Sequence, residues 1–473
     1  MFDLGLGLAF WGGFGEIAAP GATSAVPHPT IRPMPSSPKP AVRNPWSWVP
    51  TSYLSEGIPF AMVIWVAGTM FKDLGHTDGQ ITLATASIGI AWSLKPLWAA
   101  FLDMYKTKKF FVLAMELFMA LLLCGIAVCL PLPNYFQITI AVLWVLAFAS
   151  ATQDICVDGI YITTLDAKKQ AAFIGVQGVF WNVGRLFGTA AVVWAAGSLK
   201  EDHGMSATAA WTWALVLAAI TLAGLAAYHW FILPTGSITE RPKCVGEIAT
   251  TFWDSFVDFF RKEKIWGMLL FVFLYRSSEG LLLIEGPLFL QAPHDLGGVG
   301  LTLKEKGLID GTVSTAISLA AGLLGGAFMA KFGLKRRTLV FMALCLNLPH
   351  ITFVILSQLA GPGHTLSLWT IGSLVTVEKF GYSFGFVANM LYMMQQISPG
   401  KYQMTHYAFA NSLMNLMLVP TQMISGPLAD HFGYKTYFIV VMFAAIPSIL
   451  AAWFAPFPRK VELAGQETTD APA

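Results

Sequence analysis

Long apolar runs, separated by short polar or Pro/Gly-rich connections, fill the chain from about residue 52 onward. An α-helix needs about 20 apolar residues to cross a bilayer core roughly 30 Å thick, and most of the runs reach that length. They predict about twelve membrane-spanning helices, at residues 52–72, 80–102, 110–131, 135–160, 171–197, 208–233, 265–290, 307–330, 338–358, 366–395, 404–428 and 434–456. The expected fold class is therefore an all-α membrane protein.

The predicted helices form two groups of six, divided by the long polar stretch at residues 235–264. The two groups share sequence features. The tripeptide SEG occurs at residues 55–57 and again at 278–280, and a basic segment follows the second helix of each group. Such a repeat resembles the plan of major facilitator transporters, whose site lies between the repeats. The domains that we expect are a flexible Pro/Gly-rich tail at 1–44, a six-helix half at 45–234, a cytoplasmic linker with an amphipathic helix at 235–264, a second half at 265–457 and a tail at 458–473.

The composition agrees with a membrane protein, since 55% of the residues are hydrophobic and only 12% are charged. The formal net charge of +2 gives no reason to expect a nucleic-acid partner. Most of the 29 Lys and Arg residues fall in alternate connections and in the two tails. The positive-inside rule then places both termini in the cytoplasm. A cleaved signal peptide is the alternative for the start of the chain, but Asp3 and Glu16 argue against it.

Ionisable residues within the predicted spans are costly in a membrane and are therefore candidates for function. Asp154 and Asp158, in SATQDICVDGIY (150–161), lie four residues apart and share one helix face. Two neighbouring carboxylates raise each other's proton affinity, so one of them could carry a proton. Alternatively, the span ends near residue 155 and the pair binds loop cations at the cytoplasmic surface. Asp154 is the better candidate for the cavity and Asp158 for an inner gate.

The other intramembrane charges also allow two interpretations. Arg276 and Glu279 could be an internal ion pair, or a substrate clamp with a proton site. Arg185 could neutralise the aspartates at 154 and 158 or hold a substrate anion. Glu378 and Lys379 are adjacent and point about 100° apart on a helix, which favours a gating or structural role for Glu378 and leaves that of Lys379 open.

The predicted site residues fall into three groups. They are Asp154, Glu279, Asp158 and Glu56 for proton coupling, Arg185, Arg276, Gln153, Asn182, Lys379 and Glu378 for substrate binding, and Lys95 and Asp103 for gating. Tryptophans within the spans, including Trp65 and Trp181, are expected to be packing or interface residues rather than platforms for sugar rings. No metal site is expected.

Several segments resemble a known family. The order YLSEGIPF (53–60), KPLWAAFLDMYKTKKFF (95–111), SATQDICVDGIY, VEKFGYSFGFVANMLYMMQQ (377–396) and KYQMTHYAFANSL (401–413) is similar to the AmpG-type muropeptide permeases of the major facilitator superfamily. That family is related to acetyl-CoA transporters and to siderophore importers. The resemblance covers roughly residues 45–457. It implies twelve helices, a bacterial inner-membrane location and proton-driven import of N-acetylglucosaminyl-anhydromuramyl peptides for cell-wall recycling.

The resemblance also assigns residues by position. Asp154 and Asp158 match the two acids of the family's fourth span, Lys95 and Asp103 match the span-two motif, Glu378 matches the span-ten acid, and Glu279 stands where an acid is expected in span seven. The chain departs from the pattern in its proline-rich tail, in MYKTKK after Asp103 where the family has an arginine-rich run, and in the additional carboxylate of Glu56. These departures leave the substrate open.

We therefore expect a proton-coupled symporter that imports an amphipathic amino-sugar or peptide solute by alternating access. Import of a siderophore or another nutrient is the first alternative, and a membrane-complex assembly factor is an alternative from another class. An enzyme is not expected, because the chain has neither HExxH nor GxSxG. The expected partners are a small-molecule substrate and the lipid bilayer, with no cofactor apart from the proton gradient, and the expected state is a monomer.

Overall fold

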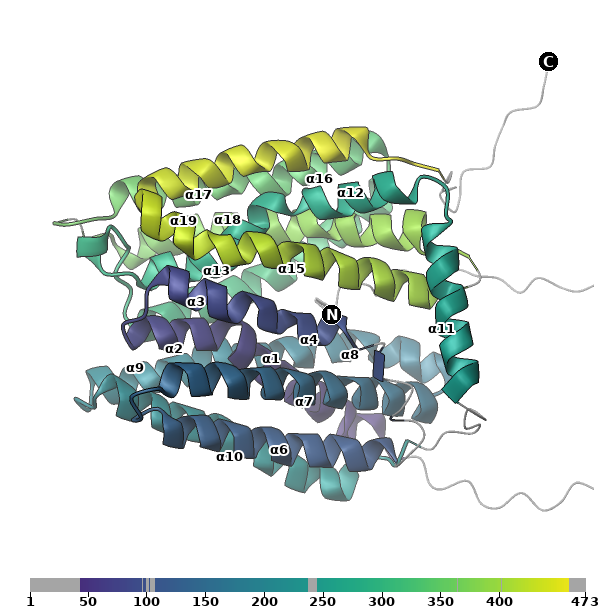
Figure 1. Ribbon diagram of the computed structural model, residues 1–473, viewed down its shortest axis with the longest axis horizontal. Helices are drawn as coiled ribbons and strands as arrows, with labels where there is room; N and C mark the ends of the chain where they lie inside the picture. The colour runs from purple at the N-terminus through teal and green to yellow at the C-terminus, as the bar shows by residue number, and fades with distance from the viewer. Residues whose placement is uncertain are drawn as a thin grey trace, which may run out of the picture.

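The structure is a computed structural model that describes residues 43–458, except for 96, 99–101, 103–106, 237–244, 364 and 401. All the regular elements in these ranges are helices, and most of them run nearly parallel to one long axis (Figure 1). Residues 43–236 form one half of this bundle and residues 265–458 form the other, and the two halves lie side by side (Figure 1).

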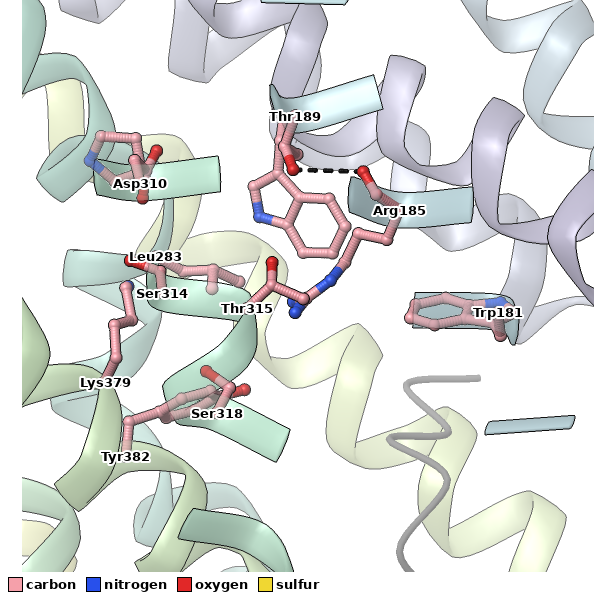
Figure 2. Close-up of a pocket in the computed structure, with 12 residues that line it drawn as sticks. Trp181, Arg185, Thr189, Leu283, Asp310, Ser314, Thr315, Ser318, Lys379 and Tyr382 are labelled. Atoms are coloured by element: carbon pink, nitrogen blue, oxygen red, sulfur yellow. Dashed lines mark hydrogen bonds between the residues drawn. The ribbon is translucent and has the colours of Figure 1, made fainter. Parts of the chain in front are cut away.

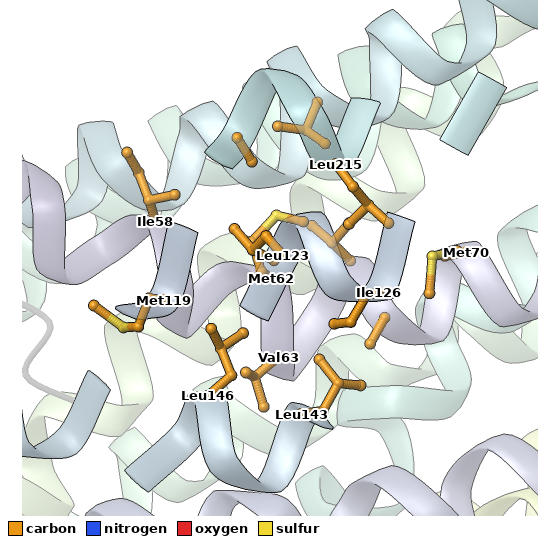
Figure 3. Close-up of a cluster of buried hydrophobic side chains, with 14 of the residues drawn as sticks. Ile58, Met62, Val63, Met70, Met119, Leu123, Ile126, Leu143, Leu146 and Leu215 are labelled. Carbon is orange, nitrogen blue, oxygen red and sulfur yellow. The ribbon is translucent and has the colours of Figure 1, made fainter. Parts of the chain in front are cut away.

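The first half contains long helices that are interrupted by short turns of different pitch. Its elements are α1 (Val49–Ala61), a π-helical turn (Met62–Val66), α2 (Ala67–Asp73), α3 (Asp78–Thr85), α4 (Ile90–Ser93), α6 (Lys108–Cys129), α7 (Tyr135–Thr164), α8 (Ala167–Leu186), a π-helical turn (Phe187–Val192), α9 (Val193–Glu201) and α10 (Ala207–Ile232). Side chains from α1, the turn after it, α6, α7 and α10 meet in an apolar core, where Ile58, Met62, Leu123, Leu146 and Leu215 are buried (Figure 3).

The second half repeats this arrangement of interrupted helices. It consists of α12 (Ile265–Tyr275), α13 (Ser277–Gln291), α14 (Leu303–Lys306), a π-helical turn (Gly307–Val313), α15 (Ser314–Phe332), α16 (Arg336–Asn347), α17 (Ile351–Leu359), α18 (Leu368–Tyr392), a π-helical turn (Met393–Ile397) and α19 (Gln403–Phe454). The backbone of α19 leaves the helical conformation at Gly433, where φ is 70° and the chain turns back on itself (Figure 1).

Nine helices in the described ranges are long and apolar enough to cross a membrane, and one of them, Thr405–Phe454, includes the reversal at Gly433. The predicted all-α membrane fold is therefore confirmed. The expected number of twelve is not reached directly. The span predicted at 80–102 includes residues outside the described ranges, and α18, with Glu378 and Lys379 in its middle, is not among the nine. The predicted tails lie almost wholly outside the described residues.

The connection between the halves contains α11 (Val245–Phe260), which runs across one end of the bundle (Figure 1). Its Phe259 side chain is fully buried, whereas 61% of the Trp253 surface is exposed. His406 of α19 contacts the backbone oxygen of Ser255 at 3.1 Å. We call this end of the bundle the linker end and the opposite end the seam end.

The halves are joined at the seam end by polar contacts. Gln291 donates to the Thr69 carbonyl oxygen at 3.0 Å, and the Gly79 backbone N–H donates to Asp430 at 2.8 Å. Lys304 forms an ion pair with Asp202 at 2.7 Å. Backbones also approach closely here, because a Cβ atom on Gly197 would lie 2.8 Å from the Lys304 nitrogen. The bundle is therefore closed at the seam end.

Candidate functional site

A cavity with about 740 Å³ of empty space, part of it open to solvent, lies between the two halves. Both halves supply its walls, which are lined by Trp65, Trp181, Arg185, Thr189, Leu283, Pro287, Asp310, Ser314, Thr315, Ser318, Lys379 and Tyr382. Figure 2 shows Trp181 and Arg185 on one side of this space, facing Lys379, Tyr382 and Asp310 on the other. The cavity combines aromatic faces, hydroxyl groups and charges, as ligand sites commonly do.

Close helix crossings hold these side chains in place. A Cβ atom on Gly57 of α1 would lie 2.2 Å from the Trp181 carbonyl oxygen of α8, and one on Gly184 would lie 2.3 Å from the Leu54 oxygen. Glycine at both positions allows α1 and α8 to pack closely, as small residues do in membrane helices. Likewise, a Cβ atom on Gly385 of α18 would lie 2.5 Å from the Met342 oxygen of α16.

Arg185 has unused hydrogen-bonding capacity that faces the cavity. Its Nε and Nη2 atoms are buried and have no hydrogen-bond partner in the described part of the chain. The guanidinium carbon lies 5.4 Å from the centre of the Trp65 ring, within the range of a cation–π contact. A guanidinium with free N–H groups in a cavity can bind a carboxylate or phosphate through paired hydrogen bonds. Arg185 is therefore a candidate anion-binding group in the site.

Lys379 supplies a second positive charge from the opposite half. Its Nζ atom lies 3.2 Å from Glu378 Oε2, and its side chain lines the cavity together with Asp310. Glu378 is buried behind the wall, where one carboxylate oxygen lies 3.9 Å from His350 Nδ1. The adjacent residues thus have separate positions, with Lys379 at the cavity and Glu378 behind it.

The two aspartates of α7 have different surroundings, and neither lines the cavity. The helix runs on to Thr164, past both residues. Asp154 is buried and ion-paired with Lys95. Asp158 accepts a hydrogen bond of 2.8 Å from the Tyr53 hydroxyl group. Asp103, the predicted gating partner of Lys95, lies outside the described residues.

Gln153 belongs to a polar network inside the first half. Its side-chain nitrogen donates to Ser55 Oγ at 2.8 Å and to Glu116 Oε1 at 3.1 Å. His229 Nδ1 lies 2.7 Å from the same Glu116 oxygen, and His229 Nε2 lies 3.0 Å from Thr51 Oγ1. The network joins α1, α6, α7 and α10, so Gln153 connects helices and does not line the cavity. Glu116 and His229 were not among the predicted residues, although each is a lone ionisable group in a long apolar run.

Arg276 and Glu279 form a buried internal pair. Arg276 Nε donates to Glu279 Oε2 at 2.6 Å, and Nη2 contacts the other carboxylate oxygen. The guanidinium also lies 4.6 Å from the centre of the Phe386 ring. The pair lies where α12 ends and α13 begins. It is separated from the cavity by Tyr382, which interacts with both residues.

Two further predicted residues lie away from the cavity walls. Glu56 is buried on α1 with 3% of its surface exposed, and Asn182 is buried on α8, where its side chain donates to the Gly178 oxygen at 2.8 Å. Among the predicted residues that the structure describes, Arg185 and Lys379 line the cavity. Sequence reasoning missed Trp65 and Trp181, which it assigned to packing, and also Asp310 and Tyr382. Asp310 is an ionisable residue near the start of the predicted span at 307–330, and this position alone would have made it a candidate.

Known proteins match the chain in both sequence and fold. Residues 51–420 match the family model of the Major Facilitator Superfamily. A transporter of the AmpG group from Rickettsia conorii (strain ATCC VR-613 / Malish 7) is 23% identical over 410 residues, which cover 83% of this chain and 92% of that protein. The anhydromuropeptide permease of Escherichia coli (strain K12) is 24% identical over 410 residues, which cover 84% of this chain and 76% of the permease. These relatives confirm the resemblance to AmpG-type permeases at low sequence identity.

A solved structure shares the arrangement of the helices. It is a bacterial homologue of the human lysosomal transporter Spinster in an inward-facing, unoccupied conformation. The two folds superimpose with a TM-score of 0.66 at 15% identity, over 88% of this chain and 98% of the other. Two halves with a cavity between them, a family model that covers most of the chain and a shared transporter fold lead to one conclusion: the chain belongs to the Major Facilitator Superfamily.

Proposed function

We propose that the protein is a secondary transporter of the bacterial inner membrane that imports an anhydromuropeptide, or a similar amino-sugar peptide, together with protons by alternating access. In this proposal both termini and the linker end face the cytoplasm, and the seam end faces outward. The structure is then an inward-facing state, sealed on the outer side. The name of the Escherichia coli relative and the distribution of Lys and Arg along the chain support the proposal.

The observation that carries the proposal is the pair of cations that the two halves present to one cavity. Arg185 comes from the first half and Lys379 from the second. A solute with acidic groups can contact both, so its binding links movements of the halves, as alternating access requires. The rings of Trp65 and Trp181 add apolar faces against which a sugar ring can pack. An anionic glycopeptide offers both kinds of group.

Protons have a role in this scheme through the buried ion pairs. Asp154 is held by Lys95, and Glu279 is held by Arg276. Protonation of either acid would remove one partner's charge and weaken the pair, which would allow its helices to move. We propose that this step couples the proton gradient to the exchange between inward-facing and outward-facing states.

The proposal is tested by uptake of a radiolabelled anhydromuropeptide into proteoliposomes that contain the purified protein. With a more acidic outside we expect accumulation above the equilibrium level, and at least about a tenfold loss of initial rate for Arg185→Ala, because the Arg185 side chain lines the cavity. Arg337→Ala removes an exposed arginine at the linker end and should leave the rate unchanged. An uptake rate that does not depend on the pH gradient would contradict proton coupling. If unlabelled ferric siderophores reduced the uptake and unlabelled muropeptides did not, the proposed substrate class would be wrong.

A further inference from the structure

A second group of buried charges lies outside the cavity, where the halves meet at the seam end. Lys72 of α2 lies 2.5 Å from Asp78 Oδ1 and 3.3 Å from the Tyr434 hydroxyl group of α19. Tyr434 donates its own proton to the second Asp78 oxygen. Asp430 of α19 accepts the Gly79 N–H at 2.8 Å. Asp78 and Asp430 are thus both held by donors.

Glu285 of α13 lies in the same group but has no donor. Its surface is fully buried, and neither carboxylate oxygen has a hydrogen-bond partner in the described part of the chain. The Asp78 carboxyl group lies within hydrogen-bonding reach of it. Two ionised carboxylates can only accept, so a hydrogen bond between them requires a proton on one. A buried, ionised and unpaired Glu285 would be strongly unfavourable.

The cation that faces Glu285, Lys72, is already paired with Asp78. The ionisable groups that face Glu285 are Lys72 and Asp78 from the first half, and Asp430, Tyr434 and Tyr437 from α19. Tyr437 donates to the Leu281 oxygen at 2.7 Å. Lys306 of α14 is the other buried cation nearby, and its Nζ atom donates to the Pro287 oxygen at 2.6 Å and to Gln291 at 3.1 Å.

We propose that Glu285 and Asp78 form a proton-binding site between the two halves, in which Glu285 carries the proton and its O–H group donates a hydrogen bond to Asp78 when the seam is closed. Opening of the seam would separate α3 from α13 and admit water, which can solvate the ionised form of Glu285. The closed state therefore binds a proton that the open state can release, so acid favours closure. The outward direction of the seam end, and hence the side from which the proton comes, rests on the proposed function.

This site differs from the acids that sequence reasoning selected. Asp154 and Glu279 each have a basic partner, Lys95 and Arg276, whereas Glu285 has another acid within reach. Carboxyl groups that share one proton are a known way of holding a proton in a protein interior. The geometry therefore makes Glu285 the residue whose protonation the closed seam requires.

The test measures closure of the seam without any substrate. The five cysteines are replaced by serine, and spin labels are attached at positions 203 and 296, which lie in exposed loops of the first and second half at the seam end. Electron–electron distances are then measured in lipid nanodiscs between about pH 5 and 9. We expect the ratio of closed to open molecules to fall by up to tenfold for each pH unit, as the release of one proton predicts.

Variants separate this site from other acids. Glu285→Gln imitates the protonated acid and should stay closed at every pH. In Asp78→Asn the new amide can donate a hydrogen bond to an ionised Glu285. Lys72 no longer has the Asp78 carboxylate as its partner and can neutralise Glu285 instead. This variant should therefore also be closed at every pH. Asp202→Asn is the control, because the hydrogen bond from Lys304 lowers the pKa of Asp202 and keeps it ionised across this range. It should retain the pH response.

A wild-type ratio that does not change with pH would overturn the proposal, as would a wild-type pH response in Glu285→Gln or in Asp78→Asn. Since no solute is present, failure of this test leaves the proposed transport function standing. Conversely, a lack of muropeptide uptake would leave the pH response of the seam unaffected.

Discussion

Charged side chains inside the bundle differ in whether the protein itself neutralises them. Arg276 and Glu279 form two contacts with each other, and Lys95 neutralises Asp154. Arg185, by contrast, keeps two buried nitrogen atoms that find no hydrogen-bond partner among the described residues. A buried charge without a partner costs much free energy. Its occurrence therefore indicates that a bound ligand supplies the partner for part of the time. At the scale of single residues, the paired charges are neutralised within the protein in this state, whereas Arg185 keeps hydrogen-bonding capacity that a bound anion could use.

Mutual neutralisation of the buried Arg276 and Glu279 charges predicts a particular pattern of stability. Arg276→Met or Glu279→Leu alone leaves one buried charge without its partner, which should lower the free energy of unfolding by about 3–5 kcal/mol. The double variant Arg276→Met/Glu279→Leu removes both charges and should recover most of that loss. Unfolding of the purified variants by denaturant in detergent measures the difference.

An exposed ion pair provides the control for this measurement. Lys169 and Asp166 lie 3.5 Å apart, with 46% and 61% of their side chains exposed. Replacing Lys169 by Met there should cost at most about 1 kcal/mol, and Asp166 is retained because its side chain also caps α8. If the double variant at 276 and 279 were as unstable as the single variants, the loss would come from packing and not from an uncompensated charge.

The sequence could not predict the direction in which each polar side chain of the site points. Gln153 was assigned to substrate binding and its neighbour Asp154 to proton coupling, and adjacent helical residues point about 100° apart. Its amide instead joins α7 to Ser55 and Glu116. Similarly, an intramembrane tryptophan fits lipid, core and cavity equally well by composition. Only the rotation of each helix, which packing against its neighbours sets, placed Trp65 and Trp181 at the cavity.

Helices were easier to predict than side-chain directions, because a span must be apolar along its whole length. The spans expected at 110–131 and 135–160 correspond to α6 at Lys108–Cys129 and α7 at Tyr135–Thr164. The interruptions within helices were not predicted. The break between α12 and α13 at Arg276 follows from local geometry that hydropathy does not record. At the scale of elements, such breaks and close crossings decide where the site residues lie.

The crossing of α1 and α8 can be tested at Gly57. Gly57→Ala would place a methyl group 2.2 Å from the Trp181 oxygen, so the helices must separate. We expect a loss of about 1–3 kcal/mol of stability, typical of overpacking, together with weaker binding at the cavity, because Trp181 and Arg185 would move with α8. Thermal unfolding with and without an anhydromuropeptide measures both effects.

Gly125→Ala on α6 is the control, since its methyl group would meet nothing within 4 Å and alanine favours the helix. Equal melting temperatures for the two variants would exclude the tight crossing.

For the whole molecule, the sequence indicated two related halves but not how they are closed. A transporter that works by alternating access uses one sequence for at least two arrangements of its halves, so composition and repeats cannot select between them. The contacts at the seam include polar and glycine-rich approaches, such as Lys304 with Asp202 and Gly197. Polar groups at such contacts can be solvated by water when the halves separate, unlike the side chains of the apolar core (Figure 3).

If the seam must open in every cycle, a covalent link across it should stop transport. In a chain without its native cysteines, Asp202→Cys and Lys304→Cys place one thiol on each half, at positions where the native side chains meet. A bifunctional thiol reagent that a reductant cleaves should abolish muropeptide uptake into proteoliposomes, and the reductant should restore it. The same reagent on Asp166→Cys/Lys169→Cys, which lie in one half, should leave uptake unchanged. Undiminished uptake by a fully linked 202–304 protein would mean that the solute crosses without opening of the seam, and the closed arrangement would then not be one state of an alternating-access cycle.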